Sequence, residues 1–213
     1  MSRMVRGLMV GIFSVVAFVA VASSASALTI SPSTTLTGTA GTTTLRINPV
    51  GGGTAIDAVC DTSSITVSAT NTASGVTTAP GTSALGNALF NRCLLSGTGL
   101  TVTQTSAWTG SVTALASGGS VTGATIRVVV PSRGVSFRTA AGCVFTVSGY
   151  RDSDLLTGST FTTIPFATAT LSLAVDSTNG AISCSAARIA VGATATFLVS
   201  TPGYSISSTT LSL

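Results

Sequence analysis

Apolar and polar residues alternate along most of this chain, in short runs separated by turn residues. Strict alternation places one side chain in two on a buried face, which is the pattern of half-buried β-strands. In the fifth run Cys143, Phe145 and Val147 share one face, and we expect this face to point into the core. The predicted strands are Thr43–Ile47, Ser64–Ala69, Leu100–Gln104, Ala124–Val130, Cys143–Val147, Thr170–Val175 and Thr194–Ser200.

Turn residues separate these runs at Gly51–Gly53, Gly118-Gly119, Asn179-Gly180 and Pro202-Gly203. Helical periodicity is absent after the first 27 residues, except that residues 82–90 fit a helical turn and a strand equally well. This regular spacing predicts an all-β fold, either an antiparallel β-sandwich or a barrel-like stack of strands.

The first 27 residues have the features of a secretory signal peptide. Arg3 and Arg6 precede the uncharged apolar run Leu8–Ala22, and the small residues Ala25 and Ala27 form an A-x-A cleavage site. An uncleaved anchor is the alternative, because a few more apolar residues would reach the ~20 needed to span a bilayer. We expect cleavage, a secreted or cell-surface protein, and no membrane span in the mature chain.

The expected mature chain, residues 28–213, has the length of one domain or of two small sandwiches. Cys60 precedes the alternating run Ile65-Thr66-Val67, and Cys184 precedes Ile189-Ala190-Val191. Two related halves, about 28–115 and 116–213, would produce this echo, and so would coincidence in a β-rich chain.

Four cysteines remain after the signal peptide: Cys60, Cys93, Cys143 and Cys184. An even number in an exported chain predicts two disulfides, and spacing alone leaves three connectivities open. Our first choice is sequential pairing, Cys60 with Cys93 and Cys143 with Cys184, because each bond would then staple one half. A zinc site is not expected, because the chain has no Cys-x-x-Cys pair and no His.

Composition excludes several function classes. Lys, Glu and His are absent, so the usual Ser-His-Asp, Cys-His and Ser-Lys arrangements are excluded. The mature chain keeps seven Arg and five Asp, a weak and scattered positive charge that does not fit nucleic-acid binding. We therefore expect a protein that is not an enzyme and holds no cofactor or metal.

Few side chains remain as candidates for chemistry. Asp152 and Asp154 could form a carboxylate pair or part of a calcium site, or simply belong to a polar hairpin tip. Asp57 and Asp61 flank Cys60, where an Asx-type turn would explain them. Trp108, the sole tryptophan, could stack on a sugar ring, although the core is the more common place for a lone Trp.

The chain resembles small exported β-rich proteins of actinobacteria. The similar features are the Leu28–Pro32 start, Phe90–Cys93 and Gly142–Gly149, with Trp108 and a late Cys184. It is more distantly similar to biofilm-associated proteins of the alkane-oxidation activator type. These resemblances imply a role at a surface or in a matrix, and they assign no functional residue.

Two functions remain as hypotheses. The first is a non-enzymatic structural or adhesive protein that acts through apolar faces and open strand edges, with Thr194–Ser200 and Ala124–Val130 as candidate edges. Its expected partners are further copies of itself or components of the cell envelope or matrix. The alternative is a secreted binding module for a carbohydrate or an apolar ligand.

Overall fold

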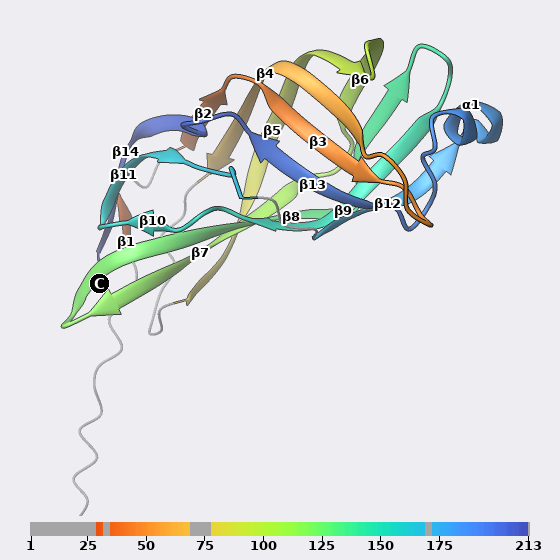
Figure 1. The fold of residues 1–213 in the computed structure, drawn as a ribbon. Helices are drawn as coiled ribbons and strands as arrows, with labels where there is room; N and C mark the ends of the chain where they lie inside the picture. Colours follow the sequence, from red (N-terminus) through yellow and green to blue (C-terminus); the bar gives the residue numbers. More distant parts are fainter. Residues whose placement is uncertain (1–28, 32–34, 69–77, 169–171, 213) are drawn as a thin grey trace, which may run out of the picture.

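The computed structural model describes residues 29–31, 35–68, 78–168 and 172–212, so the predicted signal peptide lies outside the described residues. The described part consists almost entirely of antiparallel strands in one fourteen-stranded sheet (Figure 1). The elements are β1 Thr29–Ser31, β2 Thr35–Ala40, β3 Thr43–Asn48, β4 Ile56–Ser68, β5 Thr78–Leu95, β6 Thr98–Gln104, β7 Trp108–Ser117, β8 Ser120–Thr139, β9 Val144–Asp152, β10 Leu156–Thr157, β11 Thr160–Ile164, β12 Leu173–Asn179, α1 Ala181–Ala186, β13 Thr194–Val199 and β14 Tyr204–Ser212.

The sheet closes on itself. Eight strands form a ring in which each pairs with a neighbour on both sides, in the order β3, β4, β5, β6, β8, β9, β12, β13 and back to β3. Their apolar side chains fill the inside, including Ile47, Phe145, Val147 and Val175. The predicted all-β antiparallel fold is confirmed, and the closed ring gives it a barrel-like form.

A second, smaller group of strands continues the ring at one end. β4, β5 and β8 are long enough to leave the ring, and there they pair with β2, β7 and β10. β14 joins this end by pairing with β1, β2 and β11. A separate apolar cluster fills it, formed by Ala114, Val121, Ala124, Leu156 and Phe161.

All seven predicted strands overlap strands of the structure, with different bounds, although Ala69 of Ser64–Ala69 and residues 170–171 of Thr170–Val175 lie outside the described residues. Ala124–Val130 is the middle of the twenty-residue β8, and residues 82–90 belong to β5 rather than to a helical turn. Cys143, Phe145 and Val147 are buried on one face, as predicted. Gly118-Gly119 forms the two-residue β7–β8 hairpin turn, in which both glycines have positive φ.

The prediction of open strand edges at Thr194–Ser200 and Ala124–Val130 is wrong. β13 pairs with β3 on one side. On the other side it pairs with β12 at Thr194 and Ala195, and further along it is covered by hydrogen bonds to Phe166 and Arg151. β8 lies between β7 and the strands β9 and β10. Alternation identifies a strand and its buried face, but it holds no information about the neighbours on either side.

Both halves of the chain contribute to the same ring. β3 pairs with β13, and β2 pairs with β14, so strands from the two halves are hydrogen-bonded to each other. Whether the halves are related by a repeat stays a prediction. No helix in the described ranges is long and apolar enough to span a membrane.

Candidate functional site

The two disulfides pair in sequence order, which confirms the first-choice connectivity. Cys60–Cys93 joins the neighbouring strands β4 and β5 inside the ring. Cys143–Cys184 joins the residue before β9 to the six-residue helix α1 at the end of the molecule. All four cysteines are buried, and disulfides of this kind are typical of proteins that fold outside the cytoplasm.

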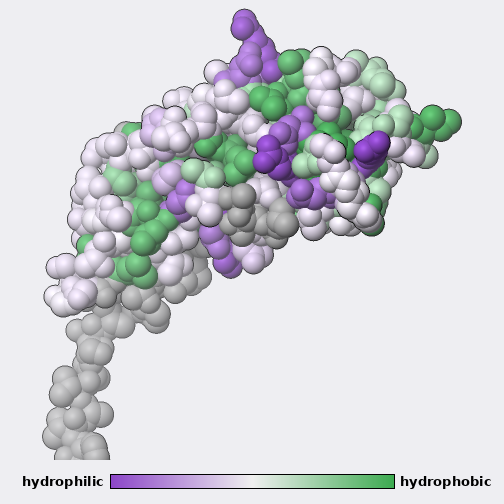
Figure 2. Space-filling view, in the orientation of Figure 1, coloured by the Kyte–Doolittle hydropathy of each residue, from purple (hydrophilic) through white to green (hydrophobic). Residues whose placement is uncertain are grey.

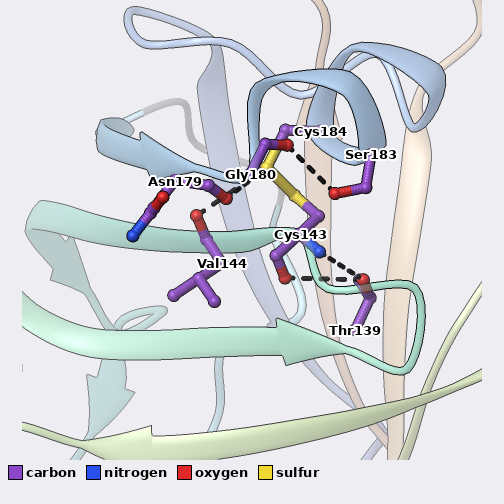
Figure 3. The surroundings of a disulfide bond; sticks show 7 residues. All are labelled: Thr139, Cys143, Val144, Asn179, Gly180, Ser183 and Cys184. Carbon is purple, nitrogen blue, oxygen red and sulfur yellow. Dashed lines mark hydrogen bonds between the residues drawn. A yellow bond between two sulfur atoms is a disulfide. The ribbon is translucent and has the colours of Figure 1, made fainter.

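The second disulfide holds α1 against the β8–β9 hairpin (Figure 3). On the hairpin side, the Cys143 backbone N–H donates to Thr139 Oγ1 at 3.0 Å, and the Thr139 N–H donates to the Cys143 carbonyl at 2.9 Å. On the helix side, Ser183 Oγ donates to the Gly180 carbonyl at 3.0 Å. Gly180 has φ +85, and a Cβ there would lie 2.5 Å from the Gly142 carbonyl oxygen, so this contact requires glycine.

Asp152 and Asp154, for which a carboxylate pair was one of the alternatives, have different partners in the structure. Asp152 accepts two hydrogen bonds from the Arg127 guanidinium at 2.6 and 2.8 Å, and this guanidinium lies 4.3 Å from the centre of the Tyr150 ring. The hydrogen bond from Arg127 lowers the pKa of Asp152. Asp154 accepts from the backbone N–H groups of Ala167 and Thr168 at 2.8 and 3.2 Å.

Arg151 precedes Asp152, and Ser153 lies between Asp152 and Asp154. Both Arg151 and Ser153 are buried rather than exposed at a hairpin tip. Arg151 Nε donates to the Phe197 carbonyl at 3.1 Å and Nη1 to the Asp152 carbonyl at 2.6 Å, while Nη2 donates to the Thr168 carbonyl. Burial lowers the pKa of Arg151. The burial of Arg151 could not be predicted from sequence, because an Arg in a polar run is normally exposed.

Two further carboxylates also take part in structural contacts. Asp57 forms a cross-strand ion pair with Arg46 instead of an Asx turn. Arg46 Nε and Nη2 donate to the two carboxylate oxygens of Asp57 at 2.9 and 2.8 Å, and these hydrogen bonds lower the pKa of Asp57. Asp176 accepts from the Arg133 backbone N–H and from the Ser132 and Thr146 hydroxyls. Burial raises the pKa of Asp176, but these donors outweigh it and the net pKa is lowered.

Metal ligands do not gather anywhere in the described ranges. No three His, Cys, Asp or Glu residues there form a group that could hold a metal ion. The calcium alternative for Asp152 and Asp154 therefore has no supporting cluster in this part of the chain.

Trp108 lies in the core, which was the more common of the two places considered for it, and does not lie exposed for stacking on a sugar. It is 6 % exposed, its indole N–H donates to the Gly134 carbonyl at 3.0 Å, and its ring centre lies 6.3 Å from that of Phe90. The apolar cavity beside it, inside the ring, has a volume of about 50 Å³. Ligand pockets typically have ~300–1,000 Å³, so this cavity is too small to hold a ligand of ordinary size.

A second aromatic side chain closes the ring interior near β14. The Tyr204 hydroxyl shares a hydrogen bond of 2.8 Å with Ser63 Oγ, which in turn shares one of 2.6 Å with Thr43 Oγ1. Burial raises the pKa of Tyr204 to about 12, against the lowering effect of these hydroxyls. Tyr204 is therefore a neutral, buried group that is not available to bind a sugar.

An open hollow of about 680 Å³ lies on the outer surface between β2, β4, β5 and the β13–β14 turn. Its lining is uncharged and rich in hydroxyls, and Asn91 Nδ2 donates to Thr62 Oγ1 at 3.3 Å within it. The lining residues are Thr39, Ala40, Gly41, Thr62, Ser63, Ser64, Asn91, Ser200, Thr201, Pro202, Gly203 and Ser205. Hydroxyls and an amide without an aromatic face can hydrogen-bond a polar neutral ligand but cannot stack on it.

Exposed aliphatic side chains gather at the end of the molecule that carries α1. Ile182 on α1 is 89 % exposed, and Val50 and Val191 lie exposed in the β3–β4 turn and in the segment after α1. Figure 2 shows a hydrophobic projection at this end, on a face that carries further hydrophobic and hydrophilic patches. A single exposed aliphatic residue is common at a protein surface, so it is the occurrence of three at one end that makes this end a candidate contact surface.

A scan against protein-family models and searches of curated proteins and of solved structures found no match. The resemblance to exported actinobacterial proteins therefore stays a prediction.

Proposed function

We propose that this chain is a non-enzymatic, exported structural or adhesive protein of the cell surface. The proposal rests on one observation: most of the carboxylates are bound within the fold, which leaves the surface largely uncharged. Four of the five aspartates are held by ion pairs or hydrogen bonds within the fold, and the exposed residues of the described chain are mainly Ser, Thr, Gly and Ala. Such a surface fits contact with another surface better than charge-driven recognition of a soluble partner.

The mechanism of contact differs from the open edges expected from sequence. Because both sides of β8 and of β13 are covered, the second side of β13 by β12, Phe166 and Arg151, adhesion through these strands would require the ring to open. The exposed aliphatic end near α1 offers a contact that leaves the ring intact.

Fractionation of cells that export the full chain tests the proposal. We expect the oxidised protein to be recovered with the envelope or matrix, or as ordered oligomers in size exclusion coupled to light scattering. A protein that stays in the medium as a monomer over a wide concentration range contradicts a structural or adhesive role.

A carbohydrate-binding module is the second candidate, and the hydroxyl-lined hollow is the observation that favours it. A glycan screen with Asn91→Ala beside the wild type tests it, because Asn91 supplies the amide of that hollow. Loss of a bound glycan in the variant would support this function, and the absence of any bound glycan in the wild type contradicts it. The small cavity beside Trp108 gives no comparable support to an apolar ligand in the core.

A further inference from the structure

Three aliphatic side chains project from the same end of the ring. Val50 follows β3, Ile182 lies on α1, and Val191 follows it in the segment leading to β13. A Cβ built on Gly192 would lie 4.0 Å from Val50 Cγ2, so the β3–β4 turn and the segment after α1 lie next to each other. Figure 1 shows both at the end of the molecule opposite to the C-terminus.

This end is rigid where Ile182 is attached. The Cys143–Cys184 disulfide and the Gly180 contact with Gly142 fix α1 on the β8–β9 hairpin. Because the helix is already held in place before any partner arrives, binding does not require the cost of ordering its backbone.

The charges at this end are positive. Arg188 directly follows α1 and Arg138 lies next to the β8–β9 hairpin turn; both are exposed, and neither belongs to an ion pair in the described part of the chain. Asp57, the carboxylate nearest the β3–β4 turn, is neutralised by Arg46. Asp176 lies away from the end, beside the bulge at residues 131–134 in the middle of β8.

From these observations we infer that the α1 end binds the surface of an anionic lipid bilayer, with Val50, Ile182 and Val191 in the interface and Arg138 and Arg188 against the headgroup phosphates. The inference rests on the proposed role at the cell surface and names the partner of the aliphatic end. Aliphatic groups beside basic ones match the acyl boundary and the negative headgroups of such a bilayer. A second copy docked end to end would instead bring arginines against arginines.

Vesicle co-sedimentation of the oxidised, exported protein tests the inference. We expect binding to vesicles of equal parts phosphatidylglycerol and phosphatidylcholine, weaker binding as salt is raised, and much weaker binding to phosphatidylcholine alone. Equal binding to both vesicle types, or none to either, would overturn the inference.

Ile182→Ser should weaken binding to the mixed vesicles about tenfold, because burying one such side chain is worth at least ~1.5 kcal/mol. The matched control is Leu155→Ser, an exposed aliphatic residue before β10, far from α1. The control should bind as the wild type does. Equal effects of the two substitutions would contradict the role of the α1 end.

Arg188→Gln tests the basic contribution, with Arg133→Gln as control. Both arginines are exposed and both have φ +55, so the two substitutions place Gln in the same backbone conformation. Only Arg188→Gln should reduce binding and its salt dependence.

Two other outcomes separate this inference from the proposed function. A dimer that Ile182→Ser abolishes would make a second copy the occupant of this end and overturn the lipid inference. A protein that sediments with cell envelopes but ignores both vesicle types would overturn the lipid inference and leave the structural or adhesive function standing.

Discussion

At the scale of single residues, buried polar side chains close the ring where strand pairing stops. Beyond Leu173 and Ala174 of β12, the neighbour of β13 is the segment around Phe166, whose carbonyl accepts from the Val199 N–H at 3.3 Å. Arg151 fills the remaining gap by donating to carbonyls on both sides. Gln104 acts similarly between β5 and β6, since its Oε1 accepts from the Ala88 N–H at 2.5 Å.

Replacing Arg151 should therefore destabilise the fold strongly. Arg151→Met removes the donors of three part-buried hydrogen bonds, to the carbonyls of Phe197, Asp152 and Thr168, which we expect to lower the free energy of unfolding by about 3 kcal/mol. Urea unfolding measures the change. Arg138→Met, at an exposed position on β8, is the control and should change it by less than ~0.5 kcal/mol. Similar effects would contradict the structural role of Arg151.

Substitutions at Gly180 and Gly97 distinguish two energetic costs of replacing a glycine: the left-handed backbone conformation and a steric clash. Gly97→Ala adds a methyl group in open space at φ +83, so it should cost only the ~1–2 kcal/mol of the left-handed conformation. Gly180→Ala, at φ +85, adds the clash with the Gly142 carbonyl and should cost clearly more. Thermal unfolding of the two variants checks the order. Equal losses would show that the Gly142 contact relaxes freely.

At the scale of elements, alternation predicted the strands well and their surroundings poorly. The buried face of Cys143, Phe145 and Val147 follows directly from a period of two, and the Gly118-Gly119 turn from residues that accept positive φ. The ring could not be predicted, because closure depends on pairs far apart in sequence such as β3 with β13. Helix α1 was missed because six residues are too few to show a helical period.

The site was less predictable than the fold, because the roles of polar residues depend on partners distant in sequence. Asp154 is positioned by Ala167 and Thr168, and Asp57 by Arg46 across a strand pair. The disulfide connectivity was the exception, since an even cysteine count left only three choices.

The two disulfides should have different local effects. Their loops span 33 and 41 residues, so loss of either is expected to lower the free energy of unfolding by about 4 kcal/mol in the loop-entropy model. Replacing Cys143 and Cys184 by Ala should also increase hydrogen exchange at residues 181–189, because α1 loses its link to the hairpin. Replacing Cys60 and Cys93 should leave that segment protected, because the Cys60–Cys93 disulfide joins two strands that are already paired with each other. Increased exchange there in both variants would contradict this local role.

At the scale of the whole molecule, stability should be flat over a wide pH range. Asp57, Asp152 and Asp176 have lowered pKa values in the folded state, so they stabilise it above their unfolded pKa near 3.8, and this contribution is lost as pH falls through the folded values. Tyr204 has a raised pKa, so its contribution is complete below pH 10 and is lost as pH rises towards about 12.

Between these limits the chain has no His, Lys or Glu to titrate. We therefore expect a plateau in the free energy of unfolding from about pH 5 to pH 9, with losses in acid and in strong base, measured by urea unfolding across pH. Tyr204→Phe is the control for the alkaline limb, which it should flatten. A marked slope inside the plateau would contradict this assignment of the titrating groups.

Ring closure also bears on how such a protein can be stored at high concentration. With so few charges, electrostatic repulsion does little to keep molecules apart, and a chain rich in Thr, Val and Ala would be expected to form fibres through unpaired backbone. In the closed ring, that backbone is already paired within the molecule, so the places left for a fibre to start are short strands outside the ring, such as β1, β10 and β11. Colloidal stability thus depends on keeping the ring closed, and reducing conditions that loosen it are where aggregation should begin.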